Sequence, residues 1–139
     1  MKKLFIDTNV MIDLIGHRNP FYSEIAKIAS LAEQQKIQLI ASSLSFVNTY
    51  YIISKNNEPK LVIDSLKKFR LICGVSAVDE LTIDKSLVSN FNDFEDGVQN
   101  YSALHSNCDI IITRNEKDFK KAQIPVMSPT EFLASINKN

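Results

Sequence analysis

Acidic side chains flank predicted apolar strands in this chain, at the places where parallel sheets bind their ligands. Asp7 directly follows the apolar residues 4–6, and Asp93 and Asp96 precede a second apolar run at residues 109–113. In an open parallel sheet, ligands bind at the carboxyl ends of the strands. Mg²⁺ is held by one or two carboxylates together with water and substrate phosphate. The spacing therefore predicts a divalent metal site that contains Asp7.

Asp93 and Asp96 stand three positions apart at a predicted helix start. They share one face of that helix, so both can approach a single metal ion. The same residues also resemble a helix cap with an acid in the first turn, which the helix dipole favours. For Asp7, too, the alternative role is that of a helix cap, although either of the next two residues can cap this helix equally well. We expect Glu95 to point elsewhere and to be solvated.

Polar side chains also follow the apolar run at residues 109–113. Thr113, Asn115 and Asp118 stand at its end or just beyond it, and they should share the rim of the sheet with Asp7. Asn115 offers a carbonyl oxygen and Asp118 a charge. Polar residues after a strand are common in ordinary loops. These three residues therefore indicate a functional site only in combination with Asp7.

Asn48 is an unusual residue on its predicted helix. It lies on the face that we expect to be buried, with Leu44, Val47 and Tyr51. A buried polar side chain must find a hydrogen-bond partner. Asn48 is therefore either a core amide that bonds a neighbouring backbone group or a site residue that points into the crevice, and the sequence leaves both interpretations open.

Strand and helix patterns alternate along the chain. Apolar runs predict strands at residues 4–6, 37–41, 71–75, 110–113 and 124–127. Helical spacing predicts helices near residues 8–14, 25–32, 44–51, 62–69, 83–91, 94–101 and 132–136, the last preceded by a capping box at residues 128–131. We expect Leu87 and Phe94 to point inward. This alternation predicts an α/β fold whose parallel sheet is covered on both faces.

Size and composition predict one domain over residues 1–139. The formal net charge is zero, whereas proteins that bind nucleic acid by electrostatics alone usually carry a basic excess. A metal ion can replace side chains as the main phosphate contact, so neutrality leaves a nucleic-acid substrate open. No apolar run is long enough for a membrane span or a signal peptide, and we expect a cytoplasmic protein without membrane association. Cys73 and Cys108 lack zinc-type spacing, and we expect buried reduced thiols.

Four segments together resemble the PIN domain family. They are FIDTNVMID at residues 5–13, SSLS at 42–45, DFEDG at 93–97 and DIIITRNEKDF at 109–119. The resemblance covers essentially the whole chain, and the first and last segments are fairly specific in this order and separation. It implies a three-layer α/β/α sandwich with a five-stranded parallel sheet. It also implies Mg²⁺- or Mn²⁺-dependent endoribonuclease activity, often as the toxin of a bacterial toxin–antitoxin pair inhibited by a small antitoxin protein, and homodimers are common in the family.

The resemblance assigns roles to residues by position. Asp7 matches the first metal-binding acid, and Asp96 matches the acid at the start of the helix before the fourth strand. Asn115 stands where the family often has its last acid, and Asp118 is the nearest carboxylate that can substitute. Asn48 stands where the family usually has a glutamate. The two amides remove negative charge from the site, and metal affinity depends on ligand charge.

The mechanism implied by the family starts from Asp7 and Asp96 as the ligands of one Mg²⁺ ion, with Asp93 or Asp118 contributing through water. The metal lowers the pKa of a bound water and aligns it for in-line attack on an RNA phosphodiester. Two further groups of residues complete the hypothesis: Asn9, Ser45 and Thr113 orient waters or the phosphate, and Arg114 and Lys117 contact backbone phosphates.

Two rival functions remain at this point. The amides at expected carboxylate positions favour a catalytically weakened or inactive PIN-like domain that binds RNA or a protein. A metal-dependent phosphatase or phospho-receiver has a similar layer order, but residues 6–9 do not fit the Asp-x-Asp pattern that such families usually carry after the first strand.

Overall fold

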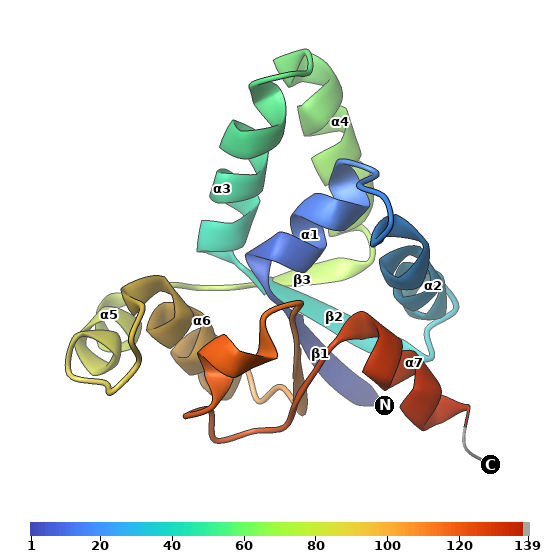
Figure 1. Cartoon of the computed structure of the whole chain (residues 1–139). Coiled ribbons are helices and arrows are strands. Elements are labelled where there is room, and N and C mark those ends of the chain that lie inside the picture. Colours follow the sequence, from blue (N-terminus) through green and yellow to red (C-terminus); the bar gives the residue numbers. More distant parts are fainter. Residues whose placement is uncertain (138–139) are drawn as a thin grey trace.

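Five parallel strands form one sheet in the computed structural model, which describes residues 1–137. The strand order is β3-β2-β1-β4-β5, so β1 lies in the middle (Figure 1). The strands are β1 (Lys2–Ile6), β2 (Ile37–Ser42), β3 (Cys73–Ser76), β4 (Ile110–Ile112) and β5 (Val126–Met127). All neighbouring pairs are parallel, and the predicted five-stranded parallel sheet is therefore confirmed.

Helices connect the strands on both sides. They are α1 (Thr8–Ile15), α2 (Tyr22–Glu33), α3 (Ser43–Ser54), α4 (Pro59–Arg70), α5 (Glu80–Leu87), α6 (Phe94–His105), the 3₁₀ helix η1 (Glu116–Phe119) and α7 (Pro129–Ile136). The predicted capping box is confirmed, because Ser128 and Glu131 each bond the other's backbone N–H. Within residues 1–137, none of the helices has the length and apolar character needed to cross a bilayer.

Two strands are shorter than their apolar runs. Leu71, which was expected in the third strand, follows α4 and is 85% exposed. Its backbone N–H bonds the Lys68 carbonyl and closes the helix, so it is not free to begin a ladder. In the last run only Val126 and Met127 pair with β4. An apolar run indicates burial, but the ends of a strand depend on which backbone groups find partners.

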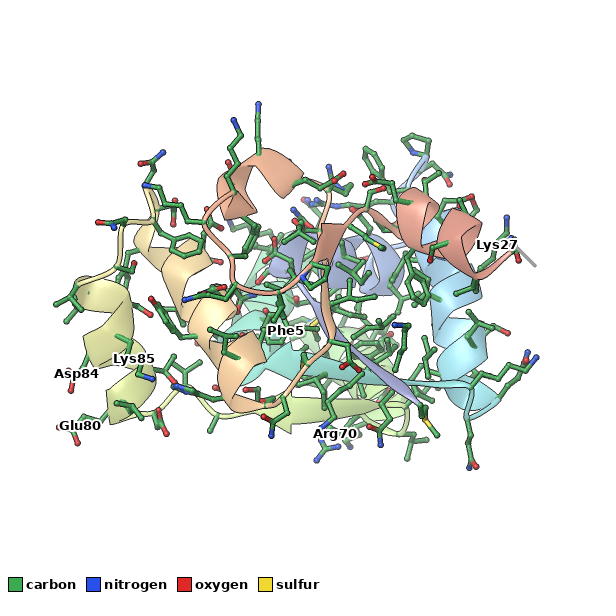
Figure 2. The ribbon with its side chains drawn as sticks, turned by 90° about the horizontal axis from the view of Figure 1, so that it is seen from below. Phe5, Lys27, Arg70, Glu80, Asp84 and Lys85 are labelled. Atoms are coloured by element: carbon green, nitrogen blue, oxygen red, sulfur yellow. The ribbon has the colours of Figure 1, made fainter. Side chains whose placement is uncertain are left out.

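Helices cover both faces of the sheet. Leu4 and Ile6 belong to the larger core, to which α1, α2, α4 and α7 contribute. Phe5 belongs to a second core beneath α6 and η1, and it lies near the centre of the molecule in Figure 2, whereas the labelled charged side chains stand at the edge. The three-layer arrangement is as predicted. Cys73 and Cys108 are free and buried, also as predicted.

The inward face predicted for α3 is wrong. Val47 and Tyr51 are 52% and 64% exposed, and Ser45, Thr49 and Ile53 are buried instead. α3 and α4 project away from the sheet side by side (Figure 1), and α3 packs along α1 and α4. Small polar side chains of α3 lie on this buried side. The spacing of its apolar residues therefore predicted the wrong side of the helix as buried.

The expected burial of Leu87 and Phe94 is also wrong, since they are 65% and 48% exposed. Leu87 is the last residue of α5 and Phe94 the first of α6. The two helices pack against each other through small residues: a Cβ atom on Gly97 would lie 3.6 Å from the Ser86 Cβ atom. A contact built from glycine and serine leaves no apolar pattern in the sequence.

The register between β1 and β4 determines where Asp7 lies. Ile6 pairs with Ile112, so Asp7 and Thr113 stand next to each other just beyond the two strands. The backbone N–H of Asp7 bonds the Ile112 carbonyl at 2.9 Å. The chain leaves β1 toward β2 and leaves β4 toward β5, in opposite directions along the sheet. Such a point of divergence opens a crevice at the carboxyl ends of the strands.

Candidate metal site

Asp7 is a buried carboxylate with defined partners on each oxygen. Its Oδ1 accepts a hydrogen bond from the Thr8 backbone N–H at 2.8 Å and another from Gln99 Nε2 at 3.1 Å. Its Oδ2 accepts one from the Thr113 hydroxyl at 2.8 Å. Each carboxylate oxygen has about two lone-pair sites. Among the described residues, Oδ1 is therefore saturated, and Oδ2 keeps one site for a further ligand.

Asp7 also caps α1, so the capping interpretation of this residue is confirmed, and its role in metal binding stays a prediction. Its side chain is only 7% exposed. Burial raises the pKa of Asp7, although the hydrogen bonds from Gln99, Thr113 and Thr8 act in the opposite direction. The charge of Asp118 raises it further. A cation at Oδ2 would favour the ionised carboxylate, because opposite charge stabilises the charged form.

A buried polar network joins Asp7 to α3 and α6. Gln99 Nε2 also donates to the Ser45 hydroxyl at 2.8 Å, and Gln99 Oε1 accepts from the Ser42 hydroxyl at 2.6 Å. Ser45 Oγ lies 2.7 Å from the Thr8 hydroxyl. Ser45, which was predicted to support the site, is therefore two hydrogen bonds away from Asp7. Gln99 and Ser42 were not predicted.

Asp96, Asp118 and Asp93 line one small pocket of about 130 Å³, together with Lys117. Asp96 is half-buried on the first turn of α6, while the other three residues are exposed at the rim. Asp93 caps α6, because its Oδ1 accepts from the Glu95 backbone N–H at 2.8 Å. The structure thus brings three of the predicted acids around one pocket, with three lysines beside them: Lys117, Lys120 and Lys121.

The acids of this pocket interact with Asp7 through their charges. Burial raises the pKa of Asp96 to about 7, with further contributions from Asp7 first and then from Asp93, Asp118 and Glu95. Partial burial also raises the pKa of Glu95, as do the charges of Asp7 and Asp93. Glu95 is exposed, as expected, but it belongs electrostatically to the same cluster. Like charges that raise one another's pKa in this way are suited to share a cation.

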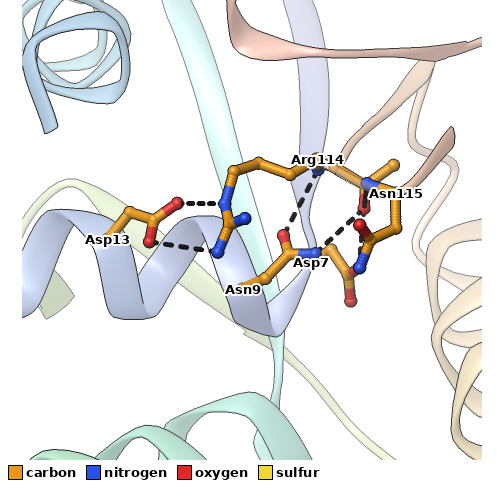
Figure 3. A network of polar contacts seen from close by, with 6 residues as sticks. Asp7, Asn9, Asp13, Arg114 and Asn115 are labelled. Carbon is orange, nitrogen blue, oxygen red and sulfur yellow. Dashed lines mark hydrogen bonds and ion pairs between the residues drawn. The ribbon is translucent and has the colours of Figure 1, made fainter. Parts of the chain in front are cut away.

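Asn9 and Asn115 surround Thr113 at the mouth of the crevice. Asn9 Nδ2 lies 3.4 Å from the Thr113 hydroxyl, and Asn9 Oδ1 accepts from the Arg114 backbone N–H at 3.4 Å. The Asn115 backbone N–H bonds the Thr113 hydroxyl at 3.1 Å, and the Asn115 side chain is exposed. These contacts hold the loop after β4 against the start of α1 (Figure 3).

Arg114 has partners that the sequence did not indicate. Its Nε lies 2.6 Å from Asp13 Oδ2, and its guanidinium stands 4.0 Å from the centre of the Phe21 ring. Asp13 is buried on α1. Arg114 therefore ties the loop after β4 to α1 and to Phe21, the residue before α2, in addition to any role toward a substrate. Lys117, which points into solvent beside Asp96, has no such partner among the described residues.

Asn48 is half-buried and makes no side-chain hydrogen bond within residues 1–137. Within the described residues, no hydrogen bond of Asn48 therefore supports either the core-amide interpretation or the site-residue interpretation. The amide side chain that contacts Asp7 is Gln99 instead. One feature of the sequence could have indicated it: Gln99 follows Asp96 by three residues, so the two side chains share a face of α6.

The residues present fit a hydrated Mg²⁺ or Mn²⁺ ion better than an all-protein cage. Within residues 1–137, no three acidic, histidine or cysteine side chains are gathered closely enough to enclose a metal. Mg²⁺ needs only one or two carboxylates, since waters complete its octahedron. Asp7 and Asp96 would supply these oxygen ligands, and the unshared lone pair of Asp7 Oδ2 is a specific place for one bond.

Comparison with known proteins identifies the family of the chain. Residues 3–117 match the profile of the family described as the PIN domain. The chain belongs to the PIN domain family. The matched residues run from β1 to η1, so this PIN domain includes Asp7, Gln99 and Asp96 within the family region.

Individual relatives support the same assignment. Ribonuclease VapC1 from Aquifex aeolicus (strain VF5) is 26% identical over 141 residues, which cover 98% of this PIN domain and 96% of that protein. FitAcB from Neisseria gonorrhoeae has a similar structure, with a TM-score of 0.71 at 16% identity over 91% of this chain and 98% of that chain. A toxin–antitoxin complex from Klebsiella pneumoniae gives 0.67 at 22% identity over 91% and 97%. At these identities the structural matches establish the fold.

Proposed function

We propose that this PIN domain is a metal-dependent endoribonuclease and the toxin of a toxin–antitoxin pair. The observation that carries the proposal is the buried Asp7 carboxylate, which keeps one lone pair of Oδ2 unshared close to the charge of Asp96. The substrate class is supported by the similarity to Ribonuclease VapC1 along nearly the whole chain.

In this proposal Asp7 and Asp96 hold Mg²⁺ or Mn²⁺, and Asp93 or Asp118 contributes through water. The bound ion would lower the pKa of a water molecule and neutralise charge on the attacked phosphodiester. Asp96 must lose its proton to bind a cation. Burial and neighbouring acids raise its pKa to about 7, so the proton is lost only as the pH approaches neutrality, and a cation must compete with it at lower pH.

The remaining side chains hold the carboxylates and the RNA. Thr113 donates to Asp7 Oδ2 and is itself held by the Asn115 backbone and by Asn9. Lys117 lines the pocket of Asp96 and is placed to bind a backbone phosphate, which fixes the position of the RNA. Arg114 can add a phosphate contact only through the guanidinium edge that Asp13 does not occupy.

The test is cleavage of a mixed-sequence RNA by the purified protein in Mg²⁺ or Mn²⁺, compared between the parent and Asp7→Asn. We expect Asp7→Asn to lose activity by at least about 100-fold and to keep its circular dichroism spectrum. Asp109→Asn is the matched control, because Asp109 is an exposed acid at the opposite end of β4, where it bonds the Lys3 backbone N–H. Equal cleavage by Asp7→Asn and the parent would overturn the assignment.

The non-catalytic alternative rests on Asn48 and Asn115, which stand where the family carries acids. It predicts RNA binding without metal-dependent cleavage by the parent protein. A gel-shift assay in a metal chelator, run beside the cleavage assay, separates the two functions. Binding with no cleavage at millimolar Mn²⁺ would favour the alternative.

A small antitoxin protein is the proposed partner, by analogy with the Klebsiella toxin–antitoxin complex. Exposed apolar side chains on the projecting helices α3 and α4 support a protein interface: Val47, Tyr51, Leu61 and Ile63. A homodimer through these residues is the second proposed assembly. Light scattering of the purified protein tests it, and a dimer that Tyr51→Arg converts to a monomer would support this surface.

A further inference from the structure

Gln99 is a fully buried side chain, and both ends of its amide are hydrogen-bonded. Nε2 lies within hydrogen-bond distance of Asp7 Oδ1, the Ser45 hydroxyl and, at 3.3 Å, the Thr8 hydroxyl. Oε1 accepts from the Ser42 hydroxyl. An ionised carboxylate can only accept, so the nitrogen end of the amide faces Asp7. The orientation of Gln99 is therefore determined by its surroundings.

The position of Gln99 links the elements that carry the acids. It lies on α6, one turn after Asp96, and it reaches the end of β1 through Asp7 and the start of α3 through Ser42 and Ser45. Movement of α6 relative to β1 would break the bond between Gln99 and Asp7. The amide thus couples the positions of Asp7 and Asp96, which come from segments far apart in the sequence.

We propose that Gln99 is a positioning residue of the metal site: it saturates Asp7 Oδ1 and so leaves Oδ2 as the oxygen that binds the ion. This inference rests on the proposed function, because it needs a metal at Asp7. Thr113 occupies one lone pair of Oδ2, and the second lone pair is the remaining place for a metal bond. Asp7 would accordingly hold the ion through Oδ2.

The expected size of the effect follows from metal sites in general. Side chains that hydrogen-bond a metal ligand orient it, and their removal typically weakens metal binding about 10–100-fold. Gln99→Met keeps a similar length and removes both the donor and the acceptor. Without the amide, Oδ1 keeps only the hydrogen bond from the Thr8 backbone N–H. The carboxylate can then rotate, and Oδ1 competes with Oδ2 for the ion.

The matched control is the next residue on the same helix. Asn100 is also a fully buried amide, but its Nδ2 donates to Gln123 at 3.0 Å and has no contact with Asp7. Asn100→Leu therefore removes a buried amide from α6 and, like Gln99→Met, keeps the size of the side chain. Any difference in metal binding between the two variants reports on the contact with Asp7.

The experiment measures Mn²⁺ binding by calorimetry, without RNA. We expect the dissociation constant of Gln99→Met to be about tenfold or more above that of the parent, and that of Asn100→Leu to be within about twofold. Equal affinity of parent and folded Gln99→Met would overturn the inference and leave the proposed function standing. Absence of Mn²⁺ binding by the parent would overturn both.

A second variant covers the case in which Gln99→Met fails to fold. Ser45→Ala removes the closest acceptor of the Gln99 amide and leaves the carboxylate of Asp7 untouched. It should raise the Mn²⁺ dissociation constant in the same direction by a smaller factor. A folded Ser45→Ala protein with the affinity of the parent would contradict the role of Gln99.

Discussion

Arg114 donates two hydrogen bonds to Asp13, at 2.6 and 3.4 Å, although the two residues are 101 positions apart (Figure 3). Asp13 is almost completely buried, while Arg114 keeps 28% of its side chain exposed. Burial raises the pKa of Asp13, and the hydrogen bond and charge of Arg114 act against this rise. The pair connects α1 to the segment after β4 that carries Asn115 and, on η1, Asp118.

Arg114→Met should destabilise the protein by roughly 3 kcal/mol, because it leaves an unpaired buried carboxylate. Asp13→Asn should cost less, since solvent reaches Arg114. The double variant Asp13→Asn/Arg114→Met should be more stable than Arg114→Met alone. Urea unfolding of the three proteins and the parent measures these differences, and additive costs in the double variant would show that the two residues do not depend on each other.

Thr113→Val removes the hydroxyl that donates to Asp7 Oδ2 and keeps the shape of the side chain. We expect a loss of about 1–2 kcal/mol in unfolding free energy, because a buried carboxylate oxygen loses a donor. RNA cleavage should fall by about tenfold or more, as the carboxylate is less well held. Thr113→Ser retains the hydroxyl and should keep most of the activity; equal rates for the valine and serine variants would contradict this role.

Asp96 should make the metal-free protein less stable as the pH rises. The folded protein keeps the Asp96 proton up to about pH 7, because burial and neighbouring acids raise this pKa, whereas the unfolded chain releases it near 3.8. Between these values the folded state binds more protons, so the free energy of unfolding decreases with increasing pH. Solvent screens this half-buried group, and the expected decrease is about 1 kcal/mol.

Urea unfolding in a chelator, at pH values of about 5 and about 8, measures this dependence. Asp96→Asn has no proton to lose and should show a flatter profile than the parent. Mn²⁺ should restore stability to the parent at the higher pH, because binding replaces the proton by a cation. An identical pH profile for Asp96→Asn and the parent would refute the assigned ionisation.

Asn48→Glu tests whether the glutamate expected from the family can be restored. Asn48 is half-buried and lies three residues after Ser45, which belongs to the Asp7 network. A carboxylate that reaches the site should lower the Mn²⁺ dissociation constant, about tenfold for a gain of 1.4 kcal/mol. Val47→Glu adds the same charge to α3 on an exposed position. Equal effects of the two variants would show that general charge, and not position, is responsible.

The local features of the fold were readable from the sequence. The sequence correctly predicted the alternation of strands and helices, the cap at Ser128 and the place of Asp7 after the first strand. The order of the strands in the sheet was not predicted. Each correctly predicted feature depends on residues within one turn or one strand of each other. Capping and apolar periodicity act over three or four positions, and such patterns survive in the sequence whatever the rest of the chain does.

The partners of the site residues were decided by the tertiary structure alone. Gln99 meets Asp7 across 92 positions, and Arg114 meets Asp13 across 101. The buried side of α3 is polar where Ser45 contacts Gln99. The spacing of the apolar residues therefore predicted the opposite side of the helix as buried. A polar side chain in a sequence shows only which hydrogen bonds it can make. Packing of the helices on the sheet decides which partner comes within reach, because a buried polar group must be satisfied by whichever neighbour the fold supplies.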